Sequence, residues 1–249
     1  MKKLFVATLV AWAASRGTIA AQFEVPGSTA GVNAALTQLF GDVTAFSAKA
    51  SAQVLGKDQK EKIVTPMEFA LSDNKLRVEV DTTQIRGPGM PTGAAASLKQ
   101  LGMDRVISVS RPDKMATYII FPGASSFVNT PMPKADVAAY QRKPKLSKVA
   151  LGKETIDGHP CVKNRVTMSD AKAVKNEATV WNATDLKDFP IQIMTKEKDD
   201  TIIIRYRQVQ FGKPDAKSFD APAGYKQYAE VEALMQGVLA KMMGGGSGK

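Results

Sequence analysis

Turn residues separate short apolar runs about every ten residues over most of this 249-residue chain. The clearest turn is Asp157-Gly158, which lies between two runs that contain β-branched residues. Both positions of such a tight turn need a positive φ angle, which Gly adopts without steric cost, so the dipeptide predicts a β-hairpin. Similar runs continue as far as Val209. This spacing favours one antiparallel sheet over a parallel α/β fold.

Polarity alternates within the runs, most clearly between Asn74 and Asp81. Leu76, Val78 and Val80 occupy every second position there, and charged residues stand between them. Because successive side chains of a strand point to opposite faces, this pattern predicts a sheet with one apolar and one polar face. We expect about ten or eleven strands in a mainly β fold that also contains α-helix. A single sheet of that size is expected to curl into a half barrel, with helices covering its concave face.

Three segments have the spacing or composition of helices. Val32–Phe40 has apolar residues on one helical face, and Tyr228–Met243 has the same spacing near the other end of the chain. Lys134–Tyr140 is long enough for one or two helical turns. Between residues 82 and 103, Gly and Pro interrupt both regular patterns, so we expect a long excursion with a helical turn near Ala94–Leu101. These segments are the available covers of the sheet.

The N-terminus has the three parts of a secretory signal peptide. Basic residues precede the apolar run Leu4–Ala14, and small residues follow as far as Ala21. The run is too short to span a bilayer. Residues 1–21 are therefore expected to be removed on export, an uncleaved anchor being the alternative. Residues 22–243 are expected to form a single domain, with a disordered Gly-rich tail at 244–249, in a protein of the periplasm or cell envelope.

Charge gives a first indication of partners. The chain has 34 Lys and Arg against 24 Asp and Glu, a formal net charge of +10. Such an excess favours anionic partners such as lipid headgroups, lipopolysaccharide or cell-wall polymers. Arg205 and Arg207 share one strand face, where solvated charges are the more frequent outcome than a headgroup site. We expect a monomer that can meet an anionic membrane surface, and no nucleic-acid partner, because the protein is exported.

His159 and Cys161 are the only His and Cys of the sequence. Zinc sites need three or four nitrogen or sulfur ligands, so no metal site is expected. A Cys-His nucleophile pair would need a third group to orient the His, and none is evident in the sequence. No Gly-x-Ser-x-Gly motif is present. We therefore expect no catalytic residue, no cofactor and no enzymatic activity, and a buried thiol at Cys161 because a single Cys cannot form an internal disulfide.

Six longer motifs lie between Phe46 and Tyr228. They are Lys75-Leu76-Arg77-Val78-Glu79, Tyr118-Ile119-Ile120-Phe121-Pro122, Leu151-Gly152-Lys153-Glu154-Thr155-Ile156-Asp157-Gly158-His159-Pro160-Cys161, Val180-Trp181-Asn182-Ala183-Thr184-Asp185-Leu186, Asp188-Phe189-Pro190, and Phe219-Asp220-Ala221-Pro222-Ala223-Gly224-Tyr225. With these motifs the chain resembles an uncharacterised family of exported bacterial proteins related to the LolA and LolB lipoprotein-sorting fold. The resemblance implies an unclosed β-barrel with helices over its mouth, around an apolar cavity. In LolA-like proteins such a cavity holds the acyl chains of lipoproteins, and related folds carry other lipids or act as envelope-stress sensors.

The apolar strand positions form the candidate ligand-binding set. Helices packed directly on them would make them a filled core, whereas helices that stand off would leave a pocket of the apolar kind that lipids occupy. The expected cavity lining is Met67, Phe69, Leu76, Val78, Tyr118, Ile120, Val180, Ile191, Ile193, Ile202 and Ile204. We predict an exported, non-enzymatic carrier or sensor that binds a lipid, an acyl chain or a lipidated protein. The alternative is an envelope interaction or stress-sensing module without lipid cargo, which docks a partner at an exposed strand edge or loop.

Overall fold

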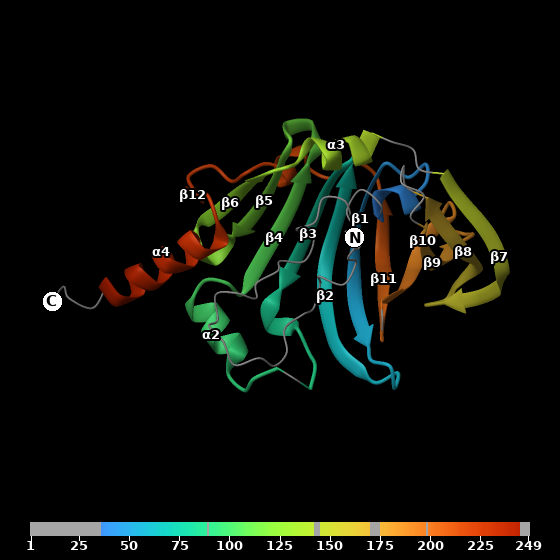
Figure 1. The fold of residues 1–249 in the computed structure, drawn as a ribbon, viewed down its shortest axis with the longest axis horizontal. Helices are drawn as coiled ribbons and strands as arrows, with labels where there is room; N and C mark the ends of the chain where they lie inside the picture. Colours follow the sequence, from blue (N-terminus) through green and yellow to red (C-terminus); the bar gives the residue numbers. More distant parts are fainter. Residues whose placement is uncertain (1–35, 89, 142–144, 170–174, 198, 245–249) are drawn as a thin grey trace.

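The computed structural model describes residues 36–88, 90–141, 145–169, 175–197 and 199–244. Twelve strands in these ranges form one sheet, accompanied by a few short helices (Figure 1). The expected mainly β fold is therefore confirmed. The proposed signal peptide, the first part of the expected N-terminal helix and the Gly-rich tail beyond residue 244 lie outside the described residues, and residues 36–39 are helical.

The strands follow one another across the sheet almost in chain order. Their bounds are β1 Ala45–Leu55, β2 Glu61–Ser72, β3 Lys75–Asp81, β4 Arg105–Arg111, β5 Ala116–Phe121, β6 Ser126–Pro131, β7 Lys145–Ile156, β8 His159–Ser169, β9 Lys175–Ala183, β10 Phe189–Glu197, β11 Asp200–Phe211 and β12 Lys226–Tyr228. The spatial order is β12-β6-β5-β4-β3-β2-β1-β11-β10-β9-β8-β7. Neighbours are antiparallel, except that β12 runs parallel to β6. The first eleven strands lie where the apolar runs predict them, and β12 adds a three-residue edge strand.

The helices are short and lie in the connections between strands or at the end of the sheet. They are α2 Ala94–Gln100, α3 Lys134–Gln141 and α4 Val231–Gly244, together with the 3-10 turns η3 Thr82–Gln84, η4 Pro112–Lys114, η5 Pro122–Ala124 and η6 Ala216–Phe219. Helix α2 lies in the expected excursion after β3, and α4 lies where the apolar spacing predicts a C-terminal helix. Within the described ranges, no helix is long and apolar enough to cross a membrane.

Positive φ angles mark the tight turns that the sequence predicts. Asp157 and Gly158 have φ angles of 48° and 88° and join β7 to β8 in a two-residue hairpin. Asp73 and Asn74, with φ angles of 49° and 66°, join β2 to β3 in the same way. Most other residue types adopt this backbone region at a steric cost, so Gly, Asn and Asp at the turn positions favour the two hairpins.

One face of the sheet is apolar across most of its width, and we call it the apolar face. The register places Val78 beside Phe69, and it places Ile204 between Ala52 on β1 and Ile193 on β10. Buried hydrophobic residues of β1 to β3 and β8 to β11 meet there in one core cluster. The alternation that the sequence shows in β3 therefore extends over seven strands.

Segments outside the strands cover the apolar face. Leu36, Leu39 and Phe40, which precede β1, pack on the core cluster. Further along the same face, Leu234 of α4 packs with Met103, which follows α2, against β4 to β6. Figure 1 shows α2 and α4 beside that end of the sheet. Within the described ranges, the apolar face is thus covered by separate short segments and not by one continuous helical layer.

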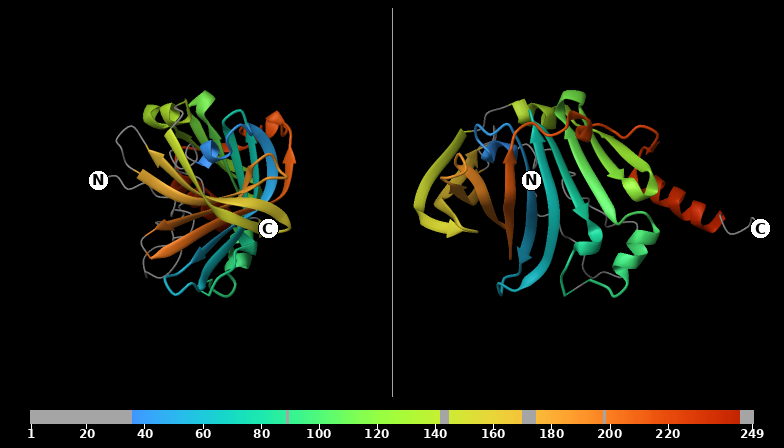
Figure 2. Two further views of the ribbon diagram at one scale, coloured as in Figure 1. Left: turned by 90° about the vertical axis from the view of Figure 1, so that its right-hand side faces the viewer. Right: turned by 180° about the vertical axis from the view of Figure 1, so that it is seen from behind.

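The sheet is open and twisted. Strands β7 and β12 form its two edges and are not paired with each other. Figure 2 shows that the strand direction turns progressively from one edge to the other, which is the usual behaviour of a long sheet. No closed barrel is therefore formed by the described strands.

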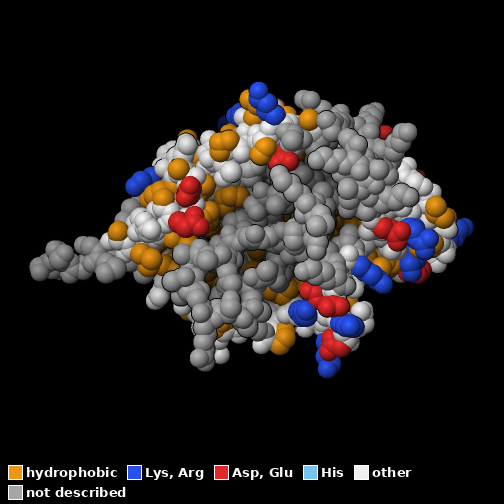
Figure 3. Space-filling view, in the orientation of Figure 1, with side chains coloured by type: hydrophobic (Ala, Val, Ile, Leu, Met, Phe, Trp, Pro, Cys, Tyr) orange, Lys and Arg blue, Asp and Glu red, His pale blue; other side chains and the backbone are white. Residues whose placement is uncertain are grey.

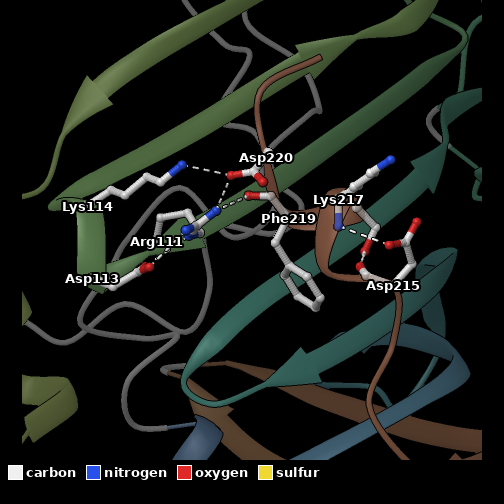
Figure 4. A network of polar contacts seen from close by, with 8 residues as sticks. Arg111, Asp113, Lys114, Asp215, Lys217, Phe219 and Asp220 are labelled. Carbon is white, nitrogen blue, oxygen red and sulfur yellow. Dashed lines mark hydrogen bonds and ion pairs between the residues drawn. The ribbon is translucent and has the colours of Figure 1, made fainter. Parts of the chain in front are cut away.

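The opposite face is apolar over β4 and β5, where the segment that contains η6 crosses it. Phe219 of this segment is fully buried among β4 and β5 side chains. Arg111 holds the segment in place by donating a 3.0 Å hydrogen bond to the Phe219 carbonyl and pairing with Asp220 (Figure 4). Asp113 accepts from the same guanidinium at 2.8 and 2.9 Å, and Lys114 lies 2.8 Å from Asp220. This network fixes the cover on β4 and β5.

Candidate ligand-binding face

Five aromatic rings meet at the centre of the apolar face. Phe46 of β1, Phe69 of β2, Phe189 of β10 and Tyr206 of β11 project from the sheet, and Phe40 comes from the segment before β1. Ring centroids lie 4.7 Å apart for Phe40 and Phe46, and 5.3 Å apart for Phe69 and Tyr206. All four ring pairs of Tyr206 within the cluster are edge-to-face, an arrangement that aromatic quadrupoles favour. These rings, which we call the aromatic cluster, form the most densely aromatic part of the described core.

Among the described residues, two hydroxyl groups on the apolar face are enclosed without a hydrogen-bond partner. Tyr206 is fully buried, and its hydroxyl makes no hydrogen bond with the part of the chain that the structure describes. Thr195 on the adjacent strand β10 has an enclosed hydroxyl in the same condition. Leaving a buried hydroxyl unpaired costs about 1–3 kcal/mol, so such groups are uncommon in native cores. A ligand with an acceptor oxygen would remove that cost.

The two hydroxyls lie along the same ladder. Thr195 pairs with Ile202, and Ile204 and Tyr206 follow Ile202 on the same face of β11. Four residues of strand separate Ile202 from Tyr206, a rise of roughly 13 Å. Burial raises the pKa of the Tyr206 phenol well above its usual range, so the group stays protonated and can act as a donor.

Most of the predicted cavity residues lie on the apolar face. Seven of them belong to the core cluster around the aromatic rings: Met67, Phe69, Leu76, Val78, Val180, Ile193 and Ile204. Ile202 lies on the same face in a smaller cluster with Val54 and Ile63. All eight are buried. A ligand contact for any of them stays a prediction.

The structure corrects the placement of three other predicted residues. Tyr118 and Ile120 lie on the opposite face, under Phe219, because the register pairs Ile120 with Ile107 and not with the apolar-face residues of β4. Strand β5 is buried on both faces, so its sequence shows no polar alternation from which the phase could be determined. Ile191 packs with Trp181 instead of with the aromatic cluster, since the register of β10 shifts between Pro190 and Gln192.

Sequence reasoning left out the most central rings. Phe46 alternates with Ala48, Ala50 and Ala52 on β1, and small side chains made that alternation faint. Tyr206 follows Ile202 and Ile204 at the period of two, so the strand pattern could have included it. Phe40 comes from outside the strands, and no alternation could have placed it on this face.

A polar groove of about 890 Å³ lies on the opposite face, over β1 to β4 and β11. Side chains of both charge signs line it, including Lys49, Glu79, Arg86, Arg105 and Arg207. Burial alone would raise the pKa of Glu79, but hydrogen bonds from Arg105 and Arg77 lower it below its ordinary value. The groove is therefore a site of balanced charge and not the expected apolar cavity.

Arg205 and Arg207 are held by the turn of the β7–β8 hairpin. Arg207 Nε lies 2.8 Å from one oxygen of Asp157, and Arg205 Nη1 lies 3.5 Å from the other. Arg205 Nε also donates to Gln192 at 2.7 Å. The two guanidinium groups thus fasten the hairpin turn to β11.

His159 and Cys161 do not form a catalytic pair. His159 Nδ1 lies 2.8 Å from Asp185, a partner that is distant in the sequence and that the sequence reasoning did not identify. The Cys161 thiol donates instead to the backbone carbonyl of His159 at 3.3 Å. Burial raises the pKa of this thiol, which disfavours the nucleophilic thiolate. No group of three or more potential metal ligands occurs within the part of the chain that the structure describes.

Comparison with solved structures finds similarities at low sequence identity and low TM-score. The structure is similar to that of a LolA superfamily protein from Nitrosomonas europaea, with 11% identity, coverage of 78% of this chain and 98% of that one, and a TM-score of 0.37. The Mycobacterium tuberculosis lipoprotein LppX is 15% identical, with 72% of this chain and 93% of that one covered and a TM-score of 0.38. The MucA/MucB complex of Pseudomonas aeruginosa is 15% identical, with 79% of this chain and 62% of that one covered and a TM-score of 0.39. Because these TM-scores lie below 0.5, the similarities carry no argument about this chain.

No protein-family model matches the sequence, and no curated protein matches it.

Proposed function

We propose that this protein is an exported, non-enzymatic carrier or sensor that binds a lipid or acyl chain against the apolar face. The observation that carries the proposal is the pair of enclosed hydroxyls, Tyr206 and Thr195, on a face whose hydrophobic core cluster extends over seven strands. A purely structural core has no use for unpaired donors, because each one costs stability. A ligand with a long apolar part and a few acceptor oxygens, such as a fatty acid or a lipid ester, would suit both features.

The expected binding mode combines hydrophobic transfer with one directed hydrogen bond. In this mode, the ligand chain lies along β11 and β10 and displaces the cover formed by Leu36, Leu39 and Phe40. Each buried methylene contributes about 0.8 kcal/mol, so a chain of roughly a dozen carbons would bind usefully. The Tyr206 hydroxyl would donate to a carboxyl or ester oxygen. In this proposal the twisted sheet is a half barrel, and the apolar face is its concave side.

The chemistry of the whole chain is compatible with an envelope location. The N-terminal pattern supports export, followed by one domain at residues 22–243 that works in the periplasm or at the cell envelope. The excess of Lys and Arg would draw the protein to anionic membrane surfaces. A lipid or a lipidated protein is the proposed partner, and the protein is proposed to act as a monomer.

Two experiments test the proposal. Lipids that co-purify with the protein are extracted and identified by mass spectrometry, and the delipidated protein is titrated with anthroyloxy-labelled stearic acid. We expect bound acyl lipids in the first and saturable uptake in the second. Delipidated protein that takes up no labelled fatty acid would refute the carrier proposal and would favour the alternative of an envelope interaction module.

A matched pair of variants tests the role of the hydroxyl. Tyr206→Phe should weaken the binding of palmitic acid about tenfold, because a hydrogen bond to a charged acceptor contributes roughly 1.5 kcal/mol, and it should leave the binding of hexadecane unchanged. Tyr118→Phe, on the opposite face, should change neither. If Tyr206→Phe bound both ligands like the parent protein, the carrier proposal would stand but the Tyr206 contact would be wrong.

A further inference from the structure

The two edges of the sheet differ in how they are covered. Strand β12 has three residues, and its Tyr228 packs with α4 residues in a core cluster. Strand β7 has twelve residues, and β8 is its single neighbour among the described strands. An edge strand presents a row of unpaired backbone N–H and C=O groups to which another strand can add. Among the described strands, the long edge therefore presents the longer row of unpaired backbone groups.

Exposed apolar side chains gather on β7. Five large hydrophobic side chains are strongly exposed in the described part of the chain, and three of them are on this strand: Leu146 at 43%, Val149 at 54% and Leu151 at 45%. A solvated edge strand gains nothing from such side chains. A partner strand added to this edge would cover exposed apolar side chains on both of its faces.

The same edge carries cations that have no acidic partner. Lys148 and Lys153 form no ion pair with the residues that the structure describes. Glu154 is bonded to Lys163 at 2.7 Å and to the Trp181 indole at 2.6 Å, so it is not free to neutralise them. At the end of the molecule where β7 and β8 lie, Figure 3 shows Lys and Arg side chains beside Asp and Glu side chains, so the unpaired cations are those of Lys148 and Lys153 and not a uniformly basic patch. The edge would therefore attract an acidic partner.

The register defines which part of the edge is regular. The pairing of β7 with β8 shifts between Ala150 and Gly152, and Gly152 has a φ angle of 154°. Such an irregularity bends an edge strand and interrupts pairing. The regular stretch before it is Leu146–Ala150. In this stretch Leu146 and Lys148 point to one face and Val149 points to the other.

We propose that Leu146–Ala150 of β7 docks an extended, acidic segment of a partner protein as an added strand. The partner segment would supply backbone hydrogen bonds, an acidic side chain beside Lys148 and an apolar side chain beside Val149. Charge argues against a second copy of this chain, because self-pairing would bring the lysines of both strands together. Leu146 and Lys148 pair with Met168 and Val166 of the apolar face, so this docking edge borders the face proposed to bind lipid.

A short peptide of defined sequence tests the proposal. A fluorescein-labelled decapeptide of alternating Glu and Val presents acids to one face and valines to the other, and a Lys-Val decapeptide is its control. We expect the Glu-Val peptide to raise fluorescence anisotropy on titration with the full-length protein, and the Lys-Val peptide to leave it unchanged. Bound peptide should also slow amide hydrogen exchange within Leu146–Ala150. Absence of binding, or protection at another segment, would overturn the proposal.

Charge reversal locates the contact. Lys148→Glu should raise the Kd of the Glu-Val peptide about fivefold, the conversion of roughly 1 kcal/mol for a cross-strand charge pair. Lys99→Glu, at an equally exposed position on α2, is the matched control and should leave the Kd unchanged. Lys148 is exposed, so its variant should keep the melting temperature of the parent protein. Equal effects of the two substitutions would overturn the proposal. It would also be overturned if phosphatidylglycerol vesicles bound the protein in a Lys148-dependent way and the peptide did not bind.

Discussion

Tyr206→Phe should make the ligand-free protein more stable. The substitution removes one hydroxyl that is enclosed without a partner and leaves the ring in the aromatic cluster. An unpaired buried hydroxyl costs about 1–3 kcal/mol, so we expect a gain of about 1–2 kcal/mol in the free energy of unfolding. For a chain of this size, each kcal/mol shifts the melting temperature by roughly 2–4 °C.

Alkaline pH should enlarge the difference between the two proteins. Burial raises the pKa of Tyr206 in the folded protein, whereas the phenol ionises at about pH 10 in the unfolded chain. Through Tyr206, the free energy of unfolding of the parent protein is therefore unaffected by pH below about pH 10 and falls by roughly 1.4 kcal/mol per pH unit above it. In Tyr206→Phe, this part of the dependence on pH should be absent. Tyr140, whose pKa is also raised by burial, should keep its own part.

Urea unfolding of delipidated protein measures both effects. The urea midpoint and the denaturant m value are compared at about pH 7.5 and about pH 10.5 for the parent protein, Tyr206→Phe and the opposite-face control Tyr118→Phe. We expect Tyr206→Phe to have the m value of the parent protein and a higher urea midpoint. A loss of 1 kcal/mol or more at the lower pH would show that the hydroxyl is hydrogen-bonded in solution, and the reason for placing a ligand oxygen there would be gone.

Three further predictions concern the core, the cover of β4 and β5, and the thiol. Phe69→Ala should lower the free energy of unfolding by about 3–5 kcal/mol in a urea titration, since it opens a cavity among the aromatic rings; a loss below 1 kcal/mol would contradict tight packing there. Arg111→Ala should free the η6 segment, seen as faster proteolysis near Phe219 with a cost of about 1–2 kcal/mol. Lys114 and Arg111 lower the pKa of Asp220, so the stability that this carboxylate contributes is present above its unfolded pKa and is lost as the pH falls. In Arg111→Ala, the free energy of unfolding should therefore fall less steeply at acid pH. An unchanged fall would argue against the network. Cys161 should react slowly with maleimide in the folded protein and rapidly in urea, and fast labelling of folded protein would show that the thiol is not buried.

Local patterns predicted the strands because strand positions alternate between two different environments. Leu76, Val78 and Val80 have an apolar neighbourhood, and the charged residues between them face the other way, so both the strand and its phase could be read. At Tyr118 both environments are apolar, because Phe219 covers the second one from a distance of about a hundred residues along the chain. A contact of that range leaves no periodic signal in either segment.

The same reason explains the other differences. Lys226–Tyr228 is a strand only because it lies beside β6, and three residues carry too little pattern to predict it. The partner of His159 is Asp185, which the turn after β9 brings into contact. The phase at Ile191 depends on a local irregularity of the β9–β10 ladder. Periodicity thus predicts where strands lie, whereas covers, partners and bulges are properties of the assembled sheet.

Phe40 is held by a different kind of backbone segment from the other rings of the aromatic cluster. Phe46, Phe69, Phe189 and Tyr206 are anchored on strands, whose hydrogen-bonded ladders resist displacement. Phe40 belongs to the short stretch that leads into β1, where no neighbouring strand restrains it. Displacement of Phe40 would therefore withdraw one ring and leave four in position. Because the Phe40 and Tyr206 ring centroids lie 5.6 Å apart, that displacement would expose one side of the buried phenol.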